Sequence, residues 1–205
     1  MMSDVWPMVY EERLALIDDL AELTDEQWVQ PSLCDGWTVH DVAAHLIDNA
    51  KATPLGIVRA MVRARFDFNR QNDHGMERER GATYRETLAR LRQVATRTSA
   101  PPAPLDSRLV EEVVHGEDIR RPLGIEREYP EEVVVRSLRY QARTPVSFGG
   151  AKQLASKVQL RASDTDVVIG DGVAVTGPAL SLLMAISGRK AALSDLRGPG
   201  VAALQ

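Results

Sequence analysis

Two side chains four residues apart, Glu111 and His115, could bind one cation together. In an α-helix this spacing places them one above the other, about 40° apart around the helix axis. A third ligand must come from another helix, and His45 is the candidate because it lies on the apolar side of a predicted helix. Two imidazoles and one carboxylate leave open positions on an ion, which is typical of catalytic zinc sites and also suits iron(II).

The residues alone leave alternatives open at these positions. A single Glu-x-x-x-His pair is more often a surface pair than a metal site, and a histidine on an apolar helix face is more often a hydrogen-bonded core residue. Glu112 could replace Glu111 as the ligand, because positions i and i+3 also meet on a helix. Asp41 and Asp118 could each orient a ligand histidine by accepting its ring N–H, or could equally be solvated helix ends.

The other histidines and the only cysteine are expected to stay outside this site. His40 lies about 140° from His45 around its helix, so both cannot face one ion, and we expect His40 at the surface. His74 falls in a polar segment and is expected to be exposed. Cys34 excludes an internal disulfide and a cysteine-based zinc cluster, and we expect it to be structural because the sequence indicates no base beside it.

Apolar residues at helical spacing predict four or five helices over residues 1–145, which favours a helix bundle. Thr38 is the predicted N-cap of the helix that carries His45, and Pro122-Leu123-Gly124 is expected to end the helix that carries His115. Further helices are predicted at residues 9–23, 84–98 and 131–143. The charged segment 59–80 is expected to break at residues 72–75.

The pattern changes after residue 150. Residues 158–162 alternate with period two, residues 166–172 predict a second strand and a turn, and residues 173–177 predict a third strand. An apolar helix follows at 178–187 and is closed by Gly188. We therefore expect a mainly α protein with two domains, a helix bundle over residues 1–150 and a small α+β domain over residues 151–205.

Composition narrows the possible partners and compartments. The formal net charge is −4 over 205 residues, which argues against general nucleic-acid binding. No run approaches the ~18 apolar residues of a membrane span. The N-terminal residues lack a basic segment followed by an apolar stretch, so a secretory signal is not predicted. We expect a cytoplasmic protein that binds neither nucleic acid nor a membrane.

Three segments together resemble a known family. Residues 34–46, CDGWTVHDVAAHL, resemble the second-helix motif of the mycothiol-dependent maleylpyruvate isomerase family, part of the DinB-like metal-binding superfamily. Residues 111–124, EEVVHGEDIRRPLG, resemble the second metal motif of the same family. Residues 175–189 resemble its C-terminal domain, which is related to sterol-carrier-like folds. The resemblance runs over nearly the whole chain.

This resemblance implies a DinB-like four-helix bundle that binds one divalent metal, usually zinc, through His45, Glu111 and His115. It also implies mycothiol as a thiol cofactor, with the attacking sulfur supplied from outside the chain. The implied activity is that of an isomerase or S-transferase acting on a small electrophilic, possibly acidic substrate. The C-terminal portion, roughly fifty residues, looks short for the family, so the substrate pocket could differ from that of maleylpyruvate isomerase.

Three arginines could bind the thiol cofactor or an acidic substrate, namely Arg120, Arg121 and Arg189. The guanidinium of arginine can bind a carboxylate through two hydrogen bonds. Arginines at the C-terminus of a helix are, however, usually explained by their favourable interaction with the helix dipole. Two other functions remain open, a metal-binding or ligand-binding protein without catalysis and a metal-dependent hydrolase that uses metal-bound water. A homodimer is also compatible with the sequence.

Overall fold

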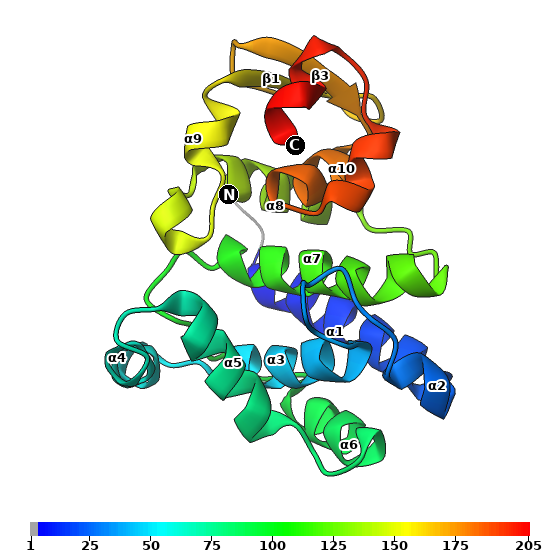
Figure 1. Ribbon diagram of the computed structural model, residues 1–205, viewed down its shortest axis with the longest axis vertical. Helices are drawn as coiled ribbons and strands as arrows, with labels where there is room; N and C mark the ends of the chain where they lie inside the picture. The colour runs from blue at the N-terminus through cyan, green and yellow to red at the C-terminus, as the bar shows by residue number, and fades with distance from the viewer. Residues whose placement is uncertain (1–3) are drawn as a thin grey trace. The chain divides into compact units, whose positions relative to one another are not determined.

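In the computed structural model, which describes residues 4–205, the chain before residue 127 is helical (Figure 1). Its helices are α1 (Val5–Ala21), α2 (Asp25–Trp28), α3 (Val39–Lys51), α4 (Pro54–Arg63), α5 (Phe68–Glu79), α6 (Tyr84–Val94) and α7 (Asp106–Leu123). Four of these form a bundle, since α1 and α3 each pack against both α6 and α7. Helix α5 packs on α3 as well, and α4 contacts α5.

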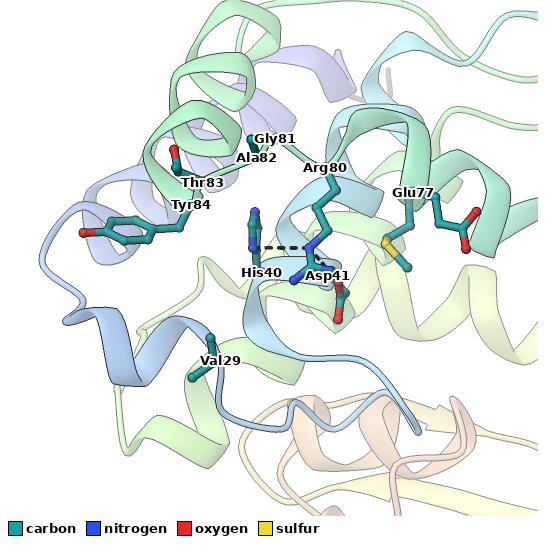
Figure 2. Close-up of a pocket in the computed structure, with 10 residues that line it drawn as sticks. Val29, His40, Asp41, Glu77, Arg80, Gly81, Ala82, Thr83 and Tyr84 are labelled. Atoms are coloured by element: carbon teal, nitrogen blue, oxygen red, sulfur yellow. Dashed lines mark hydrogen bonds and ion pairs between the residues drawn. The ribbon is translucent and has the colours of Figure 1, made fainter.

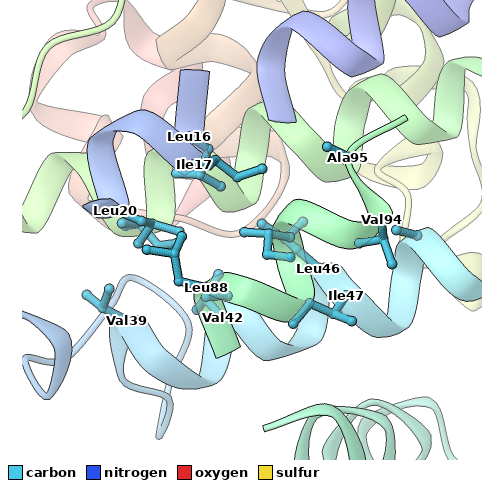
Figure 3. Close-up of a cluster of buried hydrophobic side chains, with 14 of the residues drawn as sticks. Leu16, Ile17, Leu20, Val39, Val42, Leu46, Ile47, Leu88, Val94 and Ala95 are labelled. Carbon is cyan, nitrogen blue, oxygen red and sulfur yellow. The ribbon is translucent and has the colours of Figure 1, made fainter. Parts of the chain in front are cut away.

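Apolar side chains from α1, α3 and α6 meet at the centre of this bundle (Figure 3). They include Leu16, Ile17 and Leu20 from α1, Val42, Leu46 and Ile47 from α3, and Leu88, Leu91 and Val94 from α6. Each set follows the three-to-four-residue spacing of a helix face, which is why the spacing predicted these helices. The buried face of α3 holds this helix firmly, and with it the position of His45.

Local sequence determines where α3 and α7 begin and end. The Thr38 side chain accepts from Asp41 N while the Asp41 side chain accepts from Thr38 N, which is a complete capping box. Helix α7 ends at Leu123, followed by Gly124 with φ of +68°, a conformation that glycine adopts at little cost. Both predicted ends are confirmed, although α7 begins after Leu105 without a side-chain cap.

The predicted break at residues 72–75 is wrong. These residues lie inside α5, and the chain reverses earlier, where Arg65 and Phe66 both have positive φ. Gly75 lies against the Asp48 side chain of α3, so its missing side chain permits the close approach of α5 to α3 rather than a turn. The helix predicted at residues 84–98, which is α6, also ends earlier than expected, at Val94.

The chain from Arg127 to Gln205 forms a separate α+β unit. Its elements are α8 (Glu131–Arg143), η1 (Val146–Phe148), α9 (Lys152–Ala155), β1 (Val158–Ala162), β2 (Val168–Ile169), β3 (Val173–Gly177), α10 (Ala179–Ile186), η2 (Lys190–Asp195) and η3 (Pro199–Leu204). The sheet has the order β2-β1-β3, with β1 antiparallel to β2 and parallel to β3. Helix α10 packs against β1 and α8.

The predicted fold class, mainly α with a small α+β C-terminal part, is confirmed. The division between the units falls after Glu126, whereas the sequence placed a boundary at residue 150. Helix α8 lies between the observed and the predicted boundary, and it belongs to the second unit because its apolar face packs against α10. Among residues 4–205, no helix is both long enough and apolar enough to cross a membrane.

Candidate metal centre

Helices α3 and α7 bring His45, Glu111 and His115 to one point. Oε2 of Glu111 lies 3.7 Å from Nε2 of His45 and 3.4 Å from Nε2 of His115. The two imidazole rings meet edge to face, with centroids 4.8 Å apart. One ligand atom from each residue lies within 4.8 Å of the others, so two nitrogens and one oxygen face a common space.

The ring of His115 is oriented by Asp118, three residues further along α7. Nδ1 of His115 lies 2.9 Å from Oδ2 of Asp118, whose side chain is fully buried. With a proton on Nδ1, the imidazole directs Nε2 toward Glu111. A carboxylate that accepts from the far nitrogen of a ligand histidine is a recurrent feature of metal sites. One of the two roles that the sequence left open for Asp118 therefore has structural support.

Asn49 and Arg108 also contact this site, and the sequence did not indicate either of them. Nδ2 of Asn49 lies 3.0 Å from Nε2 of His45 and 2.6 Å from Oε2 of Glu111. Nη1 of Arg108 lies 3.3 Å from both the backbone oxygen and Oδ1 of Asn49. Asn49 is one turn beyond His45 on α3, so only the helical spacing to His45 could have pointed to it.

The protonation equilibria of the three candidate ligands are shifted by burial and by one another. Burial lowers the pKa of His45 and outweighs the opposing hydrogen bond to Glu111. For Glu111, burial favours the neutral acid, but hydrogen bonds to His115 and His45 outweigh it and hold the pKa well below its usual value. Burial also opposes protonation of His115, but Asp118, Cys34 and Glu111 together raise its pKa well above the usual value.

This donor set fits a divalent transition metal. Imidazole nitrogen and carboxylate oxygen are ordinary ligands of zinc, and three protein ligands leave room for a further group. Oε2 of Glu111 faces the ring nitrogens of both histidines and also accepts from Nδ2 of Asn49. Nδ1 of His45 is buried without a hydrogen-bond partner in the described part of the chain.

The alternative ligand Glu112 points elsewhere. Its Oε1 lies 2.7 Å from Nε of Arg13 on α1, and both side chains are buried. Burial raises the pKa of Glu112 despite the arginine beside it. Nη1 of Arg13 also donates to the backbone oxygen of Arg97 at 2.9 Å. Glu112 therefore joins α7 to α1, and Glu111 is the carboxylate that faces the two histidines.

Cys34 has a base beside it, contrary to expectation. Its Sγ lies 3.0 Å from Oδ2 of Asp118 and 3.6 Å from Nδ1 of His115, so these three residues form a second group whose possible ligand atoms lie within 4.8 Å of one another. The loop that carries Cys34 is fixed by a backbone hydrogen bond from Leu33 N to Asp118 O at 3.0 Å. The thiol therefore packs behind His115, on the side away from Glu111.

His40 is buried, which corrects the expected surface position. Its Nε2 lies 2.7 Å from Oγ1 of Thr87, and its Nδ1 accepts from Nε of Arg80 at 3.3 Å. Nε of Arg80 also lies 3.2 Å from Oδ1 of Asp41, so Asp41 pairs with Arg80 and caps α3 instead of orienting His45. His40, Asp41 and Arg80 line an open cavity of about 810 Å³ (Figure 2). His74 is exposed, as expected.

The three arginines expected to bind a cofactor lie in different surroundings. Arg120 is fully buried, and its Nε lies 2.6 Å from Oδ2 of Asp19, so the packing of α7 on α1 accounts for this side chain. Nε of Arg121 donates to Glu117 one turn earlier on α7 at 2.8 Å. Arg189 belongs to the second unit, where its Nη1 donates to the backbone oxygen of Ser187. Cofactor binding by Arg120, Arg121 and Arg189 stays a prediction.

Comparison with known proteins gives both sequence and structural matches. The family model described as the mycothiol maleylpyruvate isomerase N-terminal domain matches residues 9–107, a range that includes His45 and stops short of Glu111. Among curated proteins, no sequence matches this chain. The crystal structure of the mycothiol-dependent maleylpyruvate isomerase is similar, with 17% identity and a TM-score of 0.63, over 95% of this chain and 91% of that one.

A histidine-to-alanine mutant of the mycothiol-dependent maleylpyruvate isomerase is similar over the same shares of the two chains, with 14% identity and a TM-score of 0.63. At these identities, the two crystal structures show that the fold is shared. The family model adds sequence evidence for the segment that contains the first histidine motif. The motif at residues 34–46, on which the resemblance to this family rests, lies within the segment that the family model matches.

Proposed function

We propose that this protein is an enzyme that uses a divalent metal and a low-molecular-weight thiol, mycothiol, either to isomerise a small electrophilic, possibly acidic substrate or to transfer the thiol to it. The observation that carries the proposal is the convergence of His45 Nε2, Glu111 Oε2 and His115 Nε2 from two helices. The match of residues 9–107 to the mycothiol maleylpyruvate isomerase N-terminal domain supports mycothiol as the thiol, and so does the similar crystal structure, which is described as mycothiol-dependent.

When bound, the metal would lower the pKa of a thiol and hold the resulting thiolate next to an electrophile. The protein supplies the arrangement of the ligands. Asp118 orients His115 through Nδ1, and burial lowers the pKa of His45, which favours the neutral ring that a metal ligand needs. Trp37 packs on His45, with ring centroids 5.0 Å apart, and covers one side of this imidazole.

An external thiol also agrees with the position of the cysteine. Cys34 contacts Asp118 and the Nδ1 side of His115, whereas the three candidate ligands converge on the Nε2 side of that ring. The thiol of Cys34 therefore does not face the point where a substrate would react with a metal-bound group. Since Cys34 is the chain's only cysteine, the attacking sulfur must come from a cofactor.

Metal binding is tested on purified protein supplied with zinc. We expect about one equivalent per chain by elemental analysis, with strong loss of zinc in His45→Ala and His115→Ala. His74→Ala is the matched control, because it removes an exposed imidazole. Absence of zinc from the wild-type protein after supplementation would overturn the metal site.

Thiol dependence is tested on the zinc-loaded protein with maleylpyruvate and with generic electrophiles, with and without mycothiol. We expect turnover only with the thiol, and loss of that turnover in His115→Ala. Turnover that does not need the thiol would identify a metal-dependent hydrolase instead. A full complement of zinc without turnover under any condition would favour a metal-binding protein without catalysis.

A further inference from the structure

We propose that Arg108 binds the carboxylate of an acidic substrate beside the candidate metal centre and so determines which substrates the site takes. This inference rests on the proposed function, since it names the class of substrate and the residue that would recognise it. Three features of Arg108 support it, namely the burial of its side chain, its lack of a carboxylate partner among residues 4–205 and its position one turn before Glu111 on α7.

Within residues 4–205, three arginine side chains are almost fully buried, and two of them have a carboxylate partner. Arg13 pairs with Glu112 at 2.7 Å, and Arg120 pairs with Asp19 at 2.6 Å. Arg108 is only 3% exposed, yet no carboxylate in this part of the chain forms an ion pair with it. A buried charge without a partner is costly, so an anion supplied from outside the chain would offset a cost that the fold leaves open.

The position of Arg108 within α7 adds to this cost. Arg108 is the third residue of α7, which begins at Asp106 and has no side-chain cap. The first turn of a helix carries partial positive charge and disfavours a cation. The local sequence of α7 therefore does not account for an arginine here, and an anion bound to the guanidinium would remove the conflict.

The protein uses only part of the Arg108 guanidinium. Nη1 lies 3.3 Å from both the backbone oxygen and Oδ1 of Asn49, and Nε lies 3.5 Å from Oγ of Ser107. Nη2 of Arg108 has no hydrogen-bond partner in the described part of the chain, and it keeps contact with solvent, whereas Nη2 of Arg13 and of Arg120 are completely enclosed. This terminal nitrogen can therefore donate to a carboxylate that arrives from solvent.

Arg108 lies next to the candidate metal centre. It precedes Glu111 by three residues, which places both side chains on the same side of α7. The amide of Asn49 contacts both of them, since Oδ1 lies 3.3 Å from Nη1 of Arg108 and Nδ2 lies 2.6 Å from Oε2 of Glu111. Only one amide group separates the guanidinium from a candidate ligand, so a small acid bound to Arg108 would lie beside the metal centre.

A capping role is the alternative explanation for Arg108. The backbone oxygen of Asn49 belongs to the last turn of α3, where carbonyl groups lack helical partners and positive charge is favoured. This contact needs only Nη1. The two roles predict different effects of substitution, because loss of a cap lowers stability, whereas loss of a binding residue lowers the affinity for acids.

Two substitutions separate these roles, Arg108→Met, which removes the charge, and Arg108→Lys, which keeps it. The probe is maleate, a small dicarboxylate, titrated into the zinc-loaded protein and followed by calorimetry. We expect Arg108→Met to bind maleate about 10- to 100-fold more weakly, as the loss of a hydrogen bond between charged groups predicts. Arg108→Lys should recover part of the affinity. Arg92→Met, at an exposed position on α6, is the control and should bind maleate as the wild type does.

The thiol-dependent reaction provides a second readout. In Arg108→Met, kcat/KM should fall about 10- to 100-fold more for maleylpyruvate than for dimethyl maleate, an electrophile without charge. The midpoint of urea unfolding reports on capping, and it should not fall in Arg108→Met, because the variant removes a buried charge. A lower midpoint together with unchanged maleate binding would overturn the proposal and leave Arg108 as a cap of α3.

Equal losses for maleylpyruvate and dimethyl maleate would also overturn the role of Arg108, while zinc binding and thiol dependence in the wild type would leave the proposed function intact. If the wild-type protein binds no zinc, the proposed function fails and the role of Arg108 fails with it.

Discussion

Oδ2 of Asp118 lies 2.9 Å from Nδ1 of His115 and 3.0 Å from Sγ of Cys34. The backbone oxygen of Asp118 accepts from Leu33 N at 3.0 Å. One buried residue on α7 therefore orients a candidate ligand and anchors the loop that precedes α3. The two sequence motifs, far apart along the chain, are joined through Asp118 before any metal is considered.

Asp118→Asn should weaken metal binding. The substitution keeps the size of the side chain but removes the charge that favours the Nδ1 proton and strengthens His115 as a ligand. We expect a zinc affinity lower by about 10-fold or more, measured by competition with a chelator. Asp35→Asn, an exposed position in the loop before α3, is the control and should bind zinc as the wild type does. Equal zinc affinities for the wild type, Asp118→Asn and Asp35→Asn would show that the charge of Asp118 does not strengthen His115 as a ligand.

Glu112→Gln should destabilise the helix bundle strongly, although Glu112 lies next to a candidate ligand. The substitution leaves the buried guanidinium of Arg13 without its charge partner, and such a loss typically costs about 3–5 kcal/mol. The free energy of unfolding in urea measures this cost. The double substitution Arg13→Met with Glu112→Leu should recover much of it, because well-packed apolar residues can replace a buried pair.

The control for this ion pair is Glu86→Gln, which breaks a half-exposed pair with Arg90 on α6. Exposed pairs contribute less than about 1 kcal/mol, so this variant should unfold close to the wild type. If Glu112→Gln and Glu86→Gln lose similar stability, the pair between Arg13 and Glu112 is not a major connection between α1 and α7.

The features predicted from sequence are those encoded by neighbouring residues. The capping box of Thr38 and Asp41, the strand at 158–162 and the helix at 131–143 each follow from residues a few positions apart. Helical spacing also identified Glu111 and His115 as a pair. Spacing alone left Glu111 and Glu112 open, because both lie within reach of His115 on one helix, and only the family resemblance favoured Glu111.

The features that sequence did not predict depend on contacts between distant segments. Arg13 reaches Glu112 over 99 positions, and Cys34 reaches Asp118 over 84. His40 was expected at the surface because only its own helix could be considered, and it is buried against Thr87 of α6. Gly75 resembled a turn because the sequence does not show how closely α5 approaches α3.

Thr38→Ala should destabilise the start of α3. It removes the side chain that accepts from Asp41 N, and the loss of such an N-cap typically costs about 1 kcal/mol. Urea unfolding measures this change. Thr53→Ala removes the equivalent cap of α4, a helix without buried residues, so it should change the overall transition less. A larger loss for Thr53→Ala than for Thr38→Ala would contradict this order.

The stability of the helix bundle should fall as the pH drops below about 6.5, in part because of His40. Burial lowers the pKa of His40 in the folded protein, Arg80 lowers it further, and Asp41 opposes both. Above about pH 6.5, His40 is neutral in the folded and unfolded states. Below that pH the unfolded chain takes up the proton more readily, so the free energy of unfolding decreases with falling pH.

His40→Gln should reduce this decrease, measured by urea unfolding between about pH 7.5 and 5.5. It should not remove the decrease completely, because burial lowers the pKa of His45 in the same direction. The pKa of His115 is raised, which gives stability that is lost as the pH rises, but this contribution is common to the proteins compared. His74→Gln, at an exposed position, should keep the wild-type pH dependence. If His40→Gln and His74→Gln follow the same curve, the buried imidazole of His40 does not contribute to the acid sensitivity.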